Sequence, residues 1–206
     1  MGENTAPPCI FICSRYAKTN IMLYTGKGDN GTTRTLRQKS GGRVSKASCQ
    51  TEALGTLDEL NSFLGLCKVK SGDTVWRVDN KSFSKLLDQA QQNLFIVQAE
   101  LAGADKTIKP SKIGEIETII AEMERQMPPI KSFFVSGGTE LGAMFDVART
   151  FARRAERTVI RAVEVGEVAI GDHTRAYLNR LSTLCYAMAR FCNYKSGIEE
   201  RGPTYE

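Results

Sequence analysis

The strongest constraint on the fold is the spacing of apolar residues, which recur at the helical period over nearly all of the chain beyond residue 51. Apolar residues spaced by three and four positions share one face of a helix, whereas half-buried strands require alternation at every second position. The sequence shows no sustained alternation of that kind. Helices are predicted at residues 51–70, 83–101, 116–127, 139–164 and 177–191. We therefore predict an all-α fold, a bundle of five helices.

The chain has 206 residues, of which 41% are hydrophobic, and this is enough for one domain with its own core. We divide it into a flexible N-terminal extension at residues 1–22, a helical-bundle domain at 23–195 and a C-terminal tail at 196–206. No apolar run approaches the ~20 residues of a membrane span. The N-terminus resembles neither a signal peptide nor a transit peptide. We expect a cytoplasmic protein with no membrane partner.

The six cysteines argue against a metal centre held by protein ligands. None forms a C-x-x-C pair, and His173 is the only histidine, so neither a zinc site nor the paired Glu-x-x-His motifs of a ferritin-like di-metal bundle can be built. Cys67, Cys185 and Cys192 lie at apolar positions of helical patterns, where buried free thiols are expected. The pattern indicates a reducing compartment and no metal-ligating residues.

A segment rich in glycine and threonine, residues 24–33, precedes the helices. Gly26, Gly28 and Gly31 match the G-x-G-x-x-G spacing, but no helical pattern starts directly after them, as a dinucleotide-binding fold requires. The segment does combine accessible backbone N–H groups with hydroxyls and cations, which a phosphate site needs. These come from Thr25, Thr32, Thr33, Lys27 and Arg34. The alternative is a flexible surface loop rich in turn residues.

Arg149, Arg153 and Arg157 follow one another at i, i+4 spacing and share one face of the fourth predicted helix. Like charges at this spacing cost about 0.2–0.5 kcal/mol per pair unless something neutralises them. One interpretation is a solvated face on which Glu156 pairs with Arg153. The other is a guanidinium row that faces a polyanion or a neighbouring subunit. The apolar stripe predicted on the same helix consists of Leu141, Met144, Ala148, Phe151, Ala155, Val159 and Ala162.

Other polar features leave alternatives open. The turn Ser136-Gly137-Gly138-Thr139 is either a good helix start or an anion site at a helix N-terminus. Asp58 is either an exposed helix residue or the counter-charge of an arginine. The net charge of +5 and the basic helix would also suit nucleic-acid binding, but this leaves the glycine-rich segment without a role, so we expect no nucleic-acid partner.

Taken in order, these segments resemble the PduO-type ATP:corrinoid adenosyltransferases over about residues 23–194. The resemblance rests on the joint order of several short motifs rather than on any one of them. The motifs are Tyr24 to Asp29 with Gly31 to Thr33, Glu52-Ala53-Leu54-Gly55-Thr56-Leu57-Asp58-Glu59-Leu60-Asn61, Gly137-Gly138, Val147 to Thr150 with Arg153 to Arg157, Tyr177 to Ser182, and Ala189-Arg190.

The resemblance implies a homotrimer of five-helix bundles with active sites between adjacent subunits. It implies that the glycine-rich segment orders over ATP, with Lys46 as a further nucleotide-binding lysine. The implied nucleotide-binding residues are Thr25, Gly26, Lys27, Gly28, Asp29, Gly31, Thr33, Arg34, Lys46, Arg153, Glu156, Arg157 and Asn179. Those implied to serve catalysis are Arg153, Phe133, Asp58 and Arg149. Asp58 and Arg149 would form a salt bridge across the interface, and Phe133 would lie beneath the corrin ring and keep the lower axial position empty.

The implied reaction transfers the 5′-deoxyadenosyl group of ATP, with Mg²⁺, to the Co(I) centre of a corrinoid such as cobalamin. The products would be adenosylcobalamin and triphosphate. The implied partners are a reductase for Co(II) corrinoids and an adenosylcobalamin-dependent enzyme. A non-catalytic ATP- and corrinoid-binding sensor or carrier is the alternative. The chain departs from the family pattern at Val135-Ser136 and at Ala47-Ser48-Cys49-Gln50, which bears on ATP affinity more than on the reaction.

Overall fold

The computed structural model describes residues 24–36, 42–72 and 74–205. The predicted extension at residues 1–22, with Cys9 and Cys13, lies outside the described residues.

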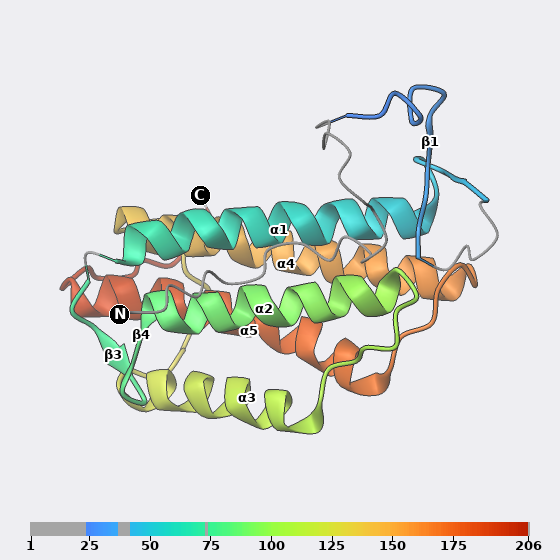
Figure 1. Ribbon diagram of the computed structural model, residues 1–206. Coiled ribbons are helices and arrows are strands. Elements are labelled where there is room, and N and C mark those ends of the chain that lie inside the picture. Colours follow the sequence, from blue (N-terminus) through green and yellow to red (C-terminus); the bar gives the residue numbers. More distant parts are fainter. Residues whose placement is uncertain (1–23, 37–41, 73, 206) are drawn as a thin grey trace, which may run out of the picture.

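Five helices form the bundle, as predicted (Figure 1). They are α1 (Cys49–Ser71), α2 (Phe83–Leu101), α3 (Pro110–Arg125), α4 (Glu140–Glu164) and α5 (Asp172–Lys195). The main packing pairs are α4 with α5, α1 with α4, α1 with α2, and α3 with α5. The third helix starts earlier than its apolar pattern indicated, with Pro110 in its first turn, and ends before Pro128-Pro129. Proline suits the first turn because the N–H it lacks has no helical partner there.

Two small antiparallel hairpins flank the helices. One pairs β1 (Thr32–Thr33) with β2 (Val44–Ser45), and the other pairs β3 (Arg77–Val78) with β4 (Lys81–Ser82). Asp79 and Asn80 form the turn of the second hairpin with φ of +49° and +59°, which is the backbone that tight hairpin turns prefer. Strands of two residues are too short to produce an alternating pattern in the sequence.

The helix starts follow capping rules. The side chains of Ser48, Ser82 and Thr139 accept hydrogen bonds from backbone N–H groups in the first turns of α1, α2 and α4. Each cap satisfies a donor that has no partner inside its helix. At the other end of α4, Glu167 accepts a hydrogen bond from Gln50 N at 2.7 Å, so the start of α1 lies beside the residues that follow α4.

The core contains an aromatic cluster in which Phe83 contacts Phe145 and Phe191 at ring-centroid distances of 6.0 and 5.6 Å. The predicted stripe of α4 is partly wrong. Leu141, Met144 and Phe151 are only partly buried, and Phe145 and Ala152 are buried instead. Because α4 packs against both α1 and α5, its buried surface is wider than one stripe.

Cys67, Cys185 and Cys192 are buried free thiols, as predicted. Burial raises the pKa of each thiol to about 12. Thiols with such a pKa stay protonated near neutral pH and behave as small apolar side chains.

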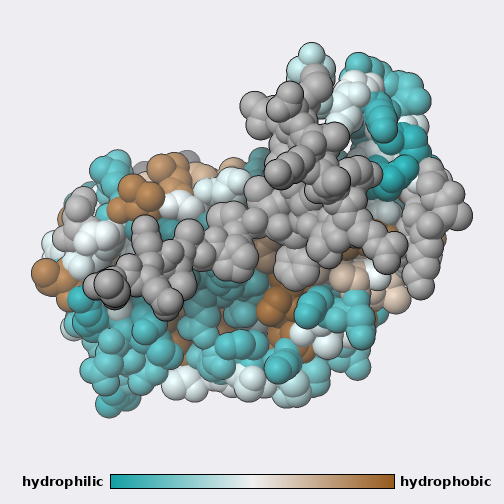
Figure 2. Space-filling view, viewed as in Figure 1, coloured by the Kyte–Doolittle hydropathy of each residue, from teal (hydrophilic) through white to brown (hydrophobic). Residues whose placement is uncertain are grey.

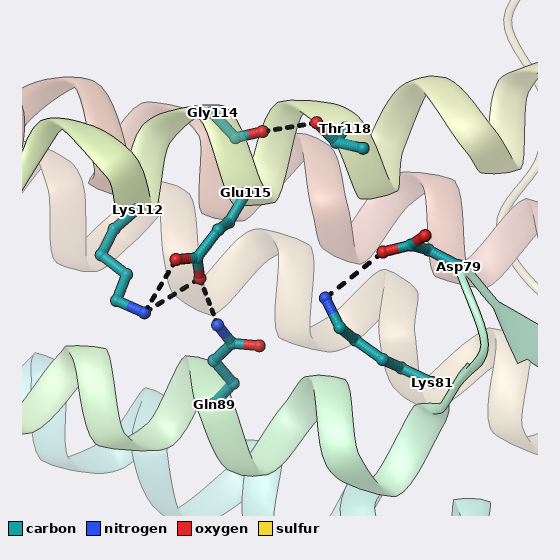
Figure 3. A network of polar contacts seen from close by, with 7 residues as sticks. All are labelled: Asp79, Lys81, Gln89, Lys112, Gly114, Glu115 and Thr118. Atoms are coloured by element: carbon teal, nitrogen blue, oxygen red, sulfur yellow. Dashed lines mark hydrogen bonds and ion pairs between the residues drawn. The ribbon is translucent and has the colours of Figure 1, made fainter.

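A polar network crosses from α2 to α3 (Figure 3). Glu115 of α3 accepts hydrogen bonds from Gln89 of α2 and from Lys112 one turn before it, the latter at 2.9 Å. Beneath this surface layer, Asn93 Nδ2 of α2 donates to the hydroxyl of Tyr177 at 3.2 Å. Among the described residues, no helix is both long and apolar enough to cross a membrane.

Candidate functional site

A cavity of about 630 Å³ opens beside the segment that joins α3 to α4. This volume lies within the range of small-molecule sites. Three predicted catalytic residues, Phe133, Arg149 and Arg153, line the same cavity. Its other lining residues are Ile130, Lys131, Ser132, Phe134, Val135, Ser136, Asp146, Ser182, Thr183, Tyr186, Ala189, Arg190, Asn193 and Glu200. The cavity therefore combines an apolar rim with cationic and polar groups from α4 and α5.

Phe133 lies at the rim of this cavity with 81% of its surface exposed. No ring contact involving Phe133 occurs within the described ranges. Ile130 and Val135, which line the same cavity, are also exposed, and apolar residues that are exposed together are typical of a ligand or partner site. Tyr186 lines the same cavity, and partial burial raises the pKa of its hydroxyl, so this hydroxyl is a neutral donor near pH 7.

The turn before α4 is built around Asn193 of α5. Asn193 Oδ1 accepts from Thr139 N at 3.0 Å, and its Nδ2 donates to Gly137 O at 2.9 Å. Gly137 and Gly138 adopt φ of +126° and +109°, a region that side chains disfavour. Gly137 N donates to Asp146 at 3.3 Å. Because internal acceptors already occupy these N–H groups, the contacts favour the helix-start interpretation over an anion site.

Arg149 is half-buried and incompletely paired. Its Nε lies 3.7 Å from Asp146 Oδ1, too far for a hydrogen bond, and has no hydrogen-bond partner in the part of the chain described. Asp58 is exposed on α1. No ion pair joins Asp58 to Arg149 within this one described chain. The predicted salt bridge across a subunit interface stays a prediction.

Of the predicted nucleotide-binding residues of α4 and α5, Arg153 lines the cavity, whereas Glu156, Arg157 and Asn179 are not among its lining residues. Asn179 Nδ2 donates to Glu156 at 3.1 Å, and Asn179 Oδ1 accepts from Arg180 at 2.8 Å. Glu156 is therefore bonded to Asn179, and no ion pair connects it to Arg153 among the described residues, so the interpretation as a local Glu156–Arg153 pair is wrong. Arg153 and Arg157 stay exposed.

The glycine-rich segment and Lys46 come together in the hairpin β1–β2. Gly31 N donates to Gly28 O at 3.1 Å, and Lys46 N donates to Gly31 O at 2.9 Å. A Cβ atom at Gly28 would lie 3.2 Å from Lys46 Nζ, so the ammonium group lies directly beside the glycine turn. Gly26 and Gly31 adopt φ of +66° and +76°, which explains why glycine occupies both positions.

Arg43 was missed by the sequence analysis, yet it fixes this hairpin. Its Nε donates to Thr32 Oγ1 at 2.6 Å and its guanidinium also donates to Thr32 O at 2.7 Å. The hydroxyl of Thr32 is therefore already engaged, whereas the predicted phosphate ligands Thr25, Lys27 and Arg34 stay exposed. The sequence contains no pattern from which this contact between Arg43 and Thr32 could have been predicted.

The hairpin lies at one end of the bundle (Figure 1), whereas the residues that line the cavity extend from the other end to the middle of α4 and α5. The hairpin precedes α1, whose first turn contacts the residues after α4, whereas the cavity is lined by Asp146 to Arg153 of α4 and Ser182 to Asn193 of α5. Arg153 and the end of α4 at Glu164 are separated by eleven residues, roughly 17 Å of helix at about 1.5 Å per residue. Within one chain, the predicted site residues of the hairpin therefore lie apart from Phe133, Arg149 and Arg153 in the cavity.

The family model of the cobalamin adenosyltransferases matches residues 23–192. The chain belongs to this family. It is 38% identical over 178 residues to the corrinoid adenosyltransferase PduO of Citrobacter freundii, covering 82% of this chain and 49% of that protein. It is 35% identical over 183 residues to the corrinoid adenosyltransferase of Bacillus subtilis, covering 86% of this chain and 90% of that protein.

Solved structures of the family have the same fold. A variant of the PduO-type ATP:corrinoid adenosyltransferase from Lactobacillus reuteri, complexed with cobalamin and ATP, matches with a TM-score of 0.77 and 28% identity, covering 89% of this chain and 97% of that one. Another variant, complexed with ATP, matches with a TM-score of 0.75 and 30% identity, covering 88% and 99%. The family predicted from the sequence is therefore confirmed. The chain spans about half the length of the PduO proteins of Citrobacter freundii and Salmonella typhimurium.

Among the described residues, no group of at least three His, Cys, Asp and Glu side chains is placed to hold a metal ion. The cations of the site are arginine and lysine side chains, which suit a phosphate-bearing ligand.

Proposed function

We propose that this protein transfers the 5′-deoxyadenosyl group of ATP to the Co(I) centre of a corrinoid, giving adenosylcobalamin and triphosphate. The observation that carries the proposal is the family match over residues 23–192. The cavity that joins Phe133, Arg149 and Arg153 supports it, because its apolar rim suits the face of a macrocycle and its cations suit a nucleotide.

The reaction is a displacement at carbon. The cobalt lone pair attacks the ribose C5′, a Co–C bond forms, and the C5′–O bond breaks with its electron pair leaving on triphosphate. Co(I) is itself a strong nucleophile, so no general base is needed. The protein must bring the two substrates together and stabilise the charge that develops on the leaving group.

Lys46, Arg34 and the other cations of the glycine-rich hairpin are proposed to bind the triphosphate. Mg²⁺ would enter this scheme with ATP, as part of the substrate, since Mg²⁺ in nucleotide sites is usually bound by the substrate phosphates and one or two carboxylates. Arg153, Glu156, Arg157 and Asn179 bind the nucleotide from the side of the helices.

Phe133 is proposed to cover the lower face of the corrin. Its ring carries no atom that can coordinate cobalt, and its exposed position at the cavity rim supports this role. By excluding water and other axial ligands from Co(II), it makes reduction to Co(I) easier. Asp58 and Arg149 contribute by holding the subunits that form the site.

A homotrimer with sites between subunits follows from the same proposal. In one chain the hairpin lies apart from the residues that line the cavity, which supports a site that a second chain completes. Hydrophobic residues are exposed near the end of α1 that lies away from the hairpin (Figure 2). Leu66, Val69 and Val75 are 52%, 75% and 85% exposed. The unpaired Nε of Arg149 also supports an acceptor from a neighbouring subunit.

We expect Arg149→Ala to weaken this assembly, because Asp58 of the adjacent subunit would lose its counter-charge. The measurement is the oligomer mass by light scattering over a range of protein concentrations. Arg161→Ala, an exposed arginine in the last turn of the same helix, is the matched control. An unchanged mass for Arg149→Ala at every concentration would remove the interface role.

The proposal also has consequences for the cell. Co(I) requires a reductase that supplies electrons to the Co(II) corrinoid, and the product is a cofactor for an adenosylcobalamin-dependent enzyme. We propose a cytoplasmic location, supported by the free thiols of Cys49, Cys67, Cys185 and Cys192.

The proposed activity is tested with ATP, Mg²⁺ and chemically reduced cobalamin under anaerobic conditions. The expected result is a photolabile cobalt–carbon product with an equal amount of triphosphate. If ATP binds but no product forms, the transfer is refuted and a non-catalytic sensor or carrier becomes the better function. Nucleic-acid binding with steep salt dependence would instead point to the basic face of α4.

A further inference from the structure

The residues after α5 return to the cavity and pair with its rim. Val135 N donates to Arg201 O at 2.8 Å, so the C-terminal tail lies alongside the segment that joins α3 to α4. A Cβ atom at Gly202 would lie 3.4 Å from Phe133 O, so tail and rim are in close contact there. The match to the family model ends at residue 192, so these tail residues lie outside it.

One buried guanidinium joins these parts. Arg190, in the last turns of α5, is only 7% exposed. Its Nε donates to Glu200 Oε2 at 2.8 Å, a second nitrogen donates to Pro128 O at 3.2 Å, and the guanidinium lies over the Phe134 ring at 5.2 Å. Arg190 thus contacts Pro128 at the start of the segment that joins α3 to α4, Phe134 directly after Phe133, and Glu200 of the tail.

The ion pair between Arg190 and Glu200 is buried and has a fixed geometry. The side chains of Arg190 and Glu200 are 8% and 16% exposed, so loss of either charge leaves the other buried without its partner. The planar fork of arginine bonds two acceptors in fixed directions, which the single ammonium group of lysine cannot reproduce. Phe133 itself makes no aromatic contact within the described ranges and is largely exposed, so its position depends on the backbone segment that carries it.

We propose that Arg190 is a positioning residue for Phe133, and that Glu200 of the tail is its required partner. Arg190 fixes Pro128 and Phe134 on either side of Phe133, while the tail holds Val135 from the outside. The Phe133 ring is thereby held in a fixed position beneath the corrin. This proposal rests on the function proposed above for Phe133.

The test compares full-length Glu200→Gln and Arg190→Lys with Glu199→Gln, an exposed neighbour in the same tail. Both pair variants are expected to lower turnover about tenfold at saturating substrates while the KM for ATP changes less than twofold. The Co(II) corrinoid bound with ATP, recorded without a reductant, is expected to lose most of the absorption and EPR signature of a cobalt without a lower axial ligand. Glu199→Gln is expected to behave as the wild type.

A double variant, Arg190→Lys with Glu200→Gln, separates positioning from general stability. If the two residues act through one contact, the double variant loses about as much turnover as either single variant. The proposal is overturned if the pair variants unfold at lower temperature but keep wild-type turnover and the wild-type Co(II) spectrum. It is also overturned if their losses multiply. The Co(II) spectrum needs no adenosyl transfer, so it tests the positioning role even if the wild type forms no product and the proposed reaction fails.

Discussion

At one end of the bundle the cavity rim is held by buried side chains of α5, whereas at the other end the hairpin β1–β2 is held by exposed contacts. Asn193 and Arg190, 4% and 7% exposed, each bond several parts of the rim. The hairpin contacts α1 through Thr51 Oγ1, which donates to Ser45 O at 3.1 Å at the surface. Exposed hydrogen bonds and few apolar contacts are typical of segments that open locally at low cost.

The difference fits the two proposed ligands. A rigid rim can hold a planar macrocycle at a fixed height, whereas a lightly held and hydrophilic hairpin can close over a nucleotide and open again (Figure 2). If this comparison is right, changes at the rim lower turnover or stability, and changes in the hairpin raise the KM for ATP.

The largest effect is expected for Phe133→Ala. Without the ring, axial ligands reach Co(II), and turnover at saturating substrates falls about 100-fold, which corresponds to about 2.7 kcal/mol. The KM for ATP should change less than threefold. Steady-state kinetics measure both, with Phe95→Ala, an exposed phenylalanine of α2, as control. Loss of ATP binding with unchanged turnover would contradict the assignment.

Replacing two helical glycines by alanine is expected to change the free energy of unfolding in opposite directions. A Cβ atom at Gly142 would lie 2.5 Å from Asn193 Oδ1 and 3.2 Å from Ala189 O, so Gly142→Ala forces α4 and α5 apart and destabilises the protein by about 2 kcal/mol. At Gly114 of α3 nothing lies within 4 Å, and Gly114→Ala stabilises its helix by about 0.5–1 kcal/mol. Urea unfolding at one protein concentration measures both, and equal effects would contradict the tight packing of α4 on α5.

The sequence predicted the helices well because their apolar periods are long. It also predicted that Phe133, Arg149 and Arg153 belong to one site, through the order of family motifs. It predicted that Leu141, Met144 and Phe151 are buried, but they are only partly buried. Apolar periodicity indicates which face of a helix is buried, but not how wide the buried surface is when the helix packs against two neighbours.

What the sequence could not predict were contacts between distant residues. Arg190 belongs to a family motif, but neither its pattern nor that of Asn193 indicates which residues they bond, and Glu200 lies in a tail with no pattern at all. Arg43 bonds Thr32 across a hairpin whose strands have two residues each. Burial of a polar side chain depends on the tertiary partner that satisfies it, and that partner is not encoded in local spacing.

At the hairpin end, Lys46→Ala is expected to raise the KM for ATP about tenfold. The lost ammonium lies beside the glycine turn, and a charge-assisted hydrogen bond to phosphate contributes about 1.5 kcal/mol. Stability should stay within about 0.5 kcal/mol of the wild type because the side chain is exposed. ATP titration calorimetry and steady-state kinetics measure the effect, with the exposed Lys85→Ala as control. Wild-type affinity in Lys46→Ala would place the phosphates elsewhere.

The smallest effect is expected for Arg43→Gln, which removes the guanidinium that bonds both the hydroxyl and the carbonyl of Thr32. Both hydrogen bonds are at the surface, so their loss loosens the hairpin without unfolding the bundle. The KM for ATP should rise about threefold, or about 0.7 kcal/mol, with an unchanged melting temperature. Arg77→Gln makes the same change in hairpin β3–β4, where the guanidinium bonds the adjacent Trp76 carbonyl and no other described residue, and should leave the KM unaltered. If Arg43→Gln instead lowers turnover and melting temperature together, the hairpin is part of the rigid structure, and the contrast between the two ends of the bundle is lost.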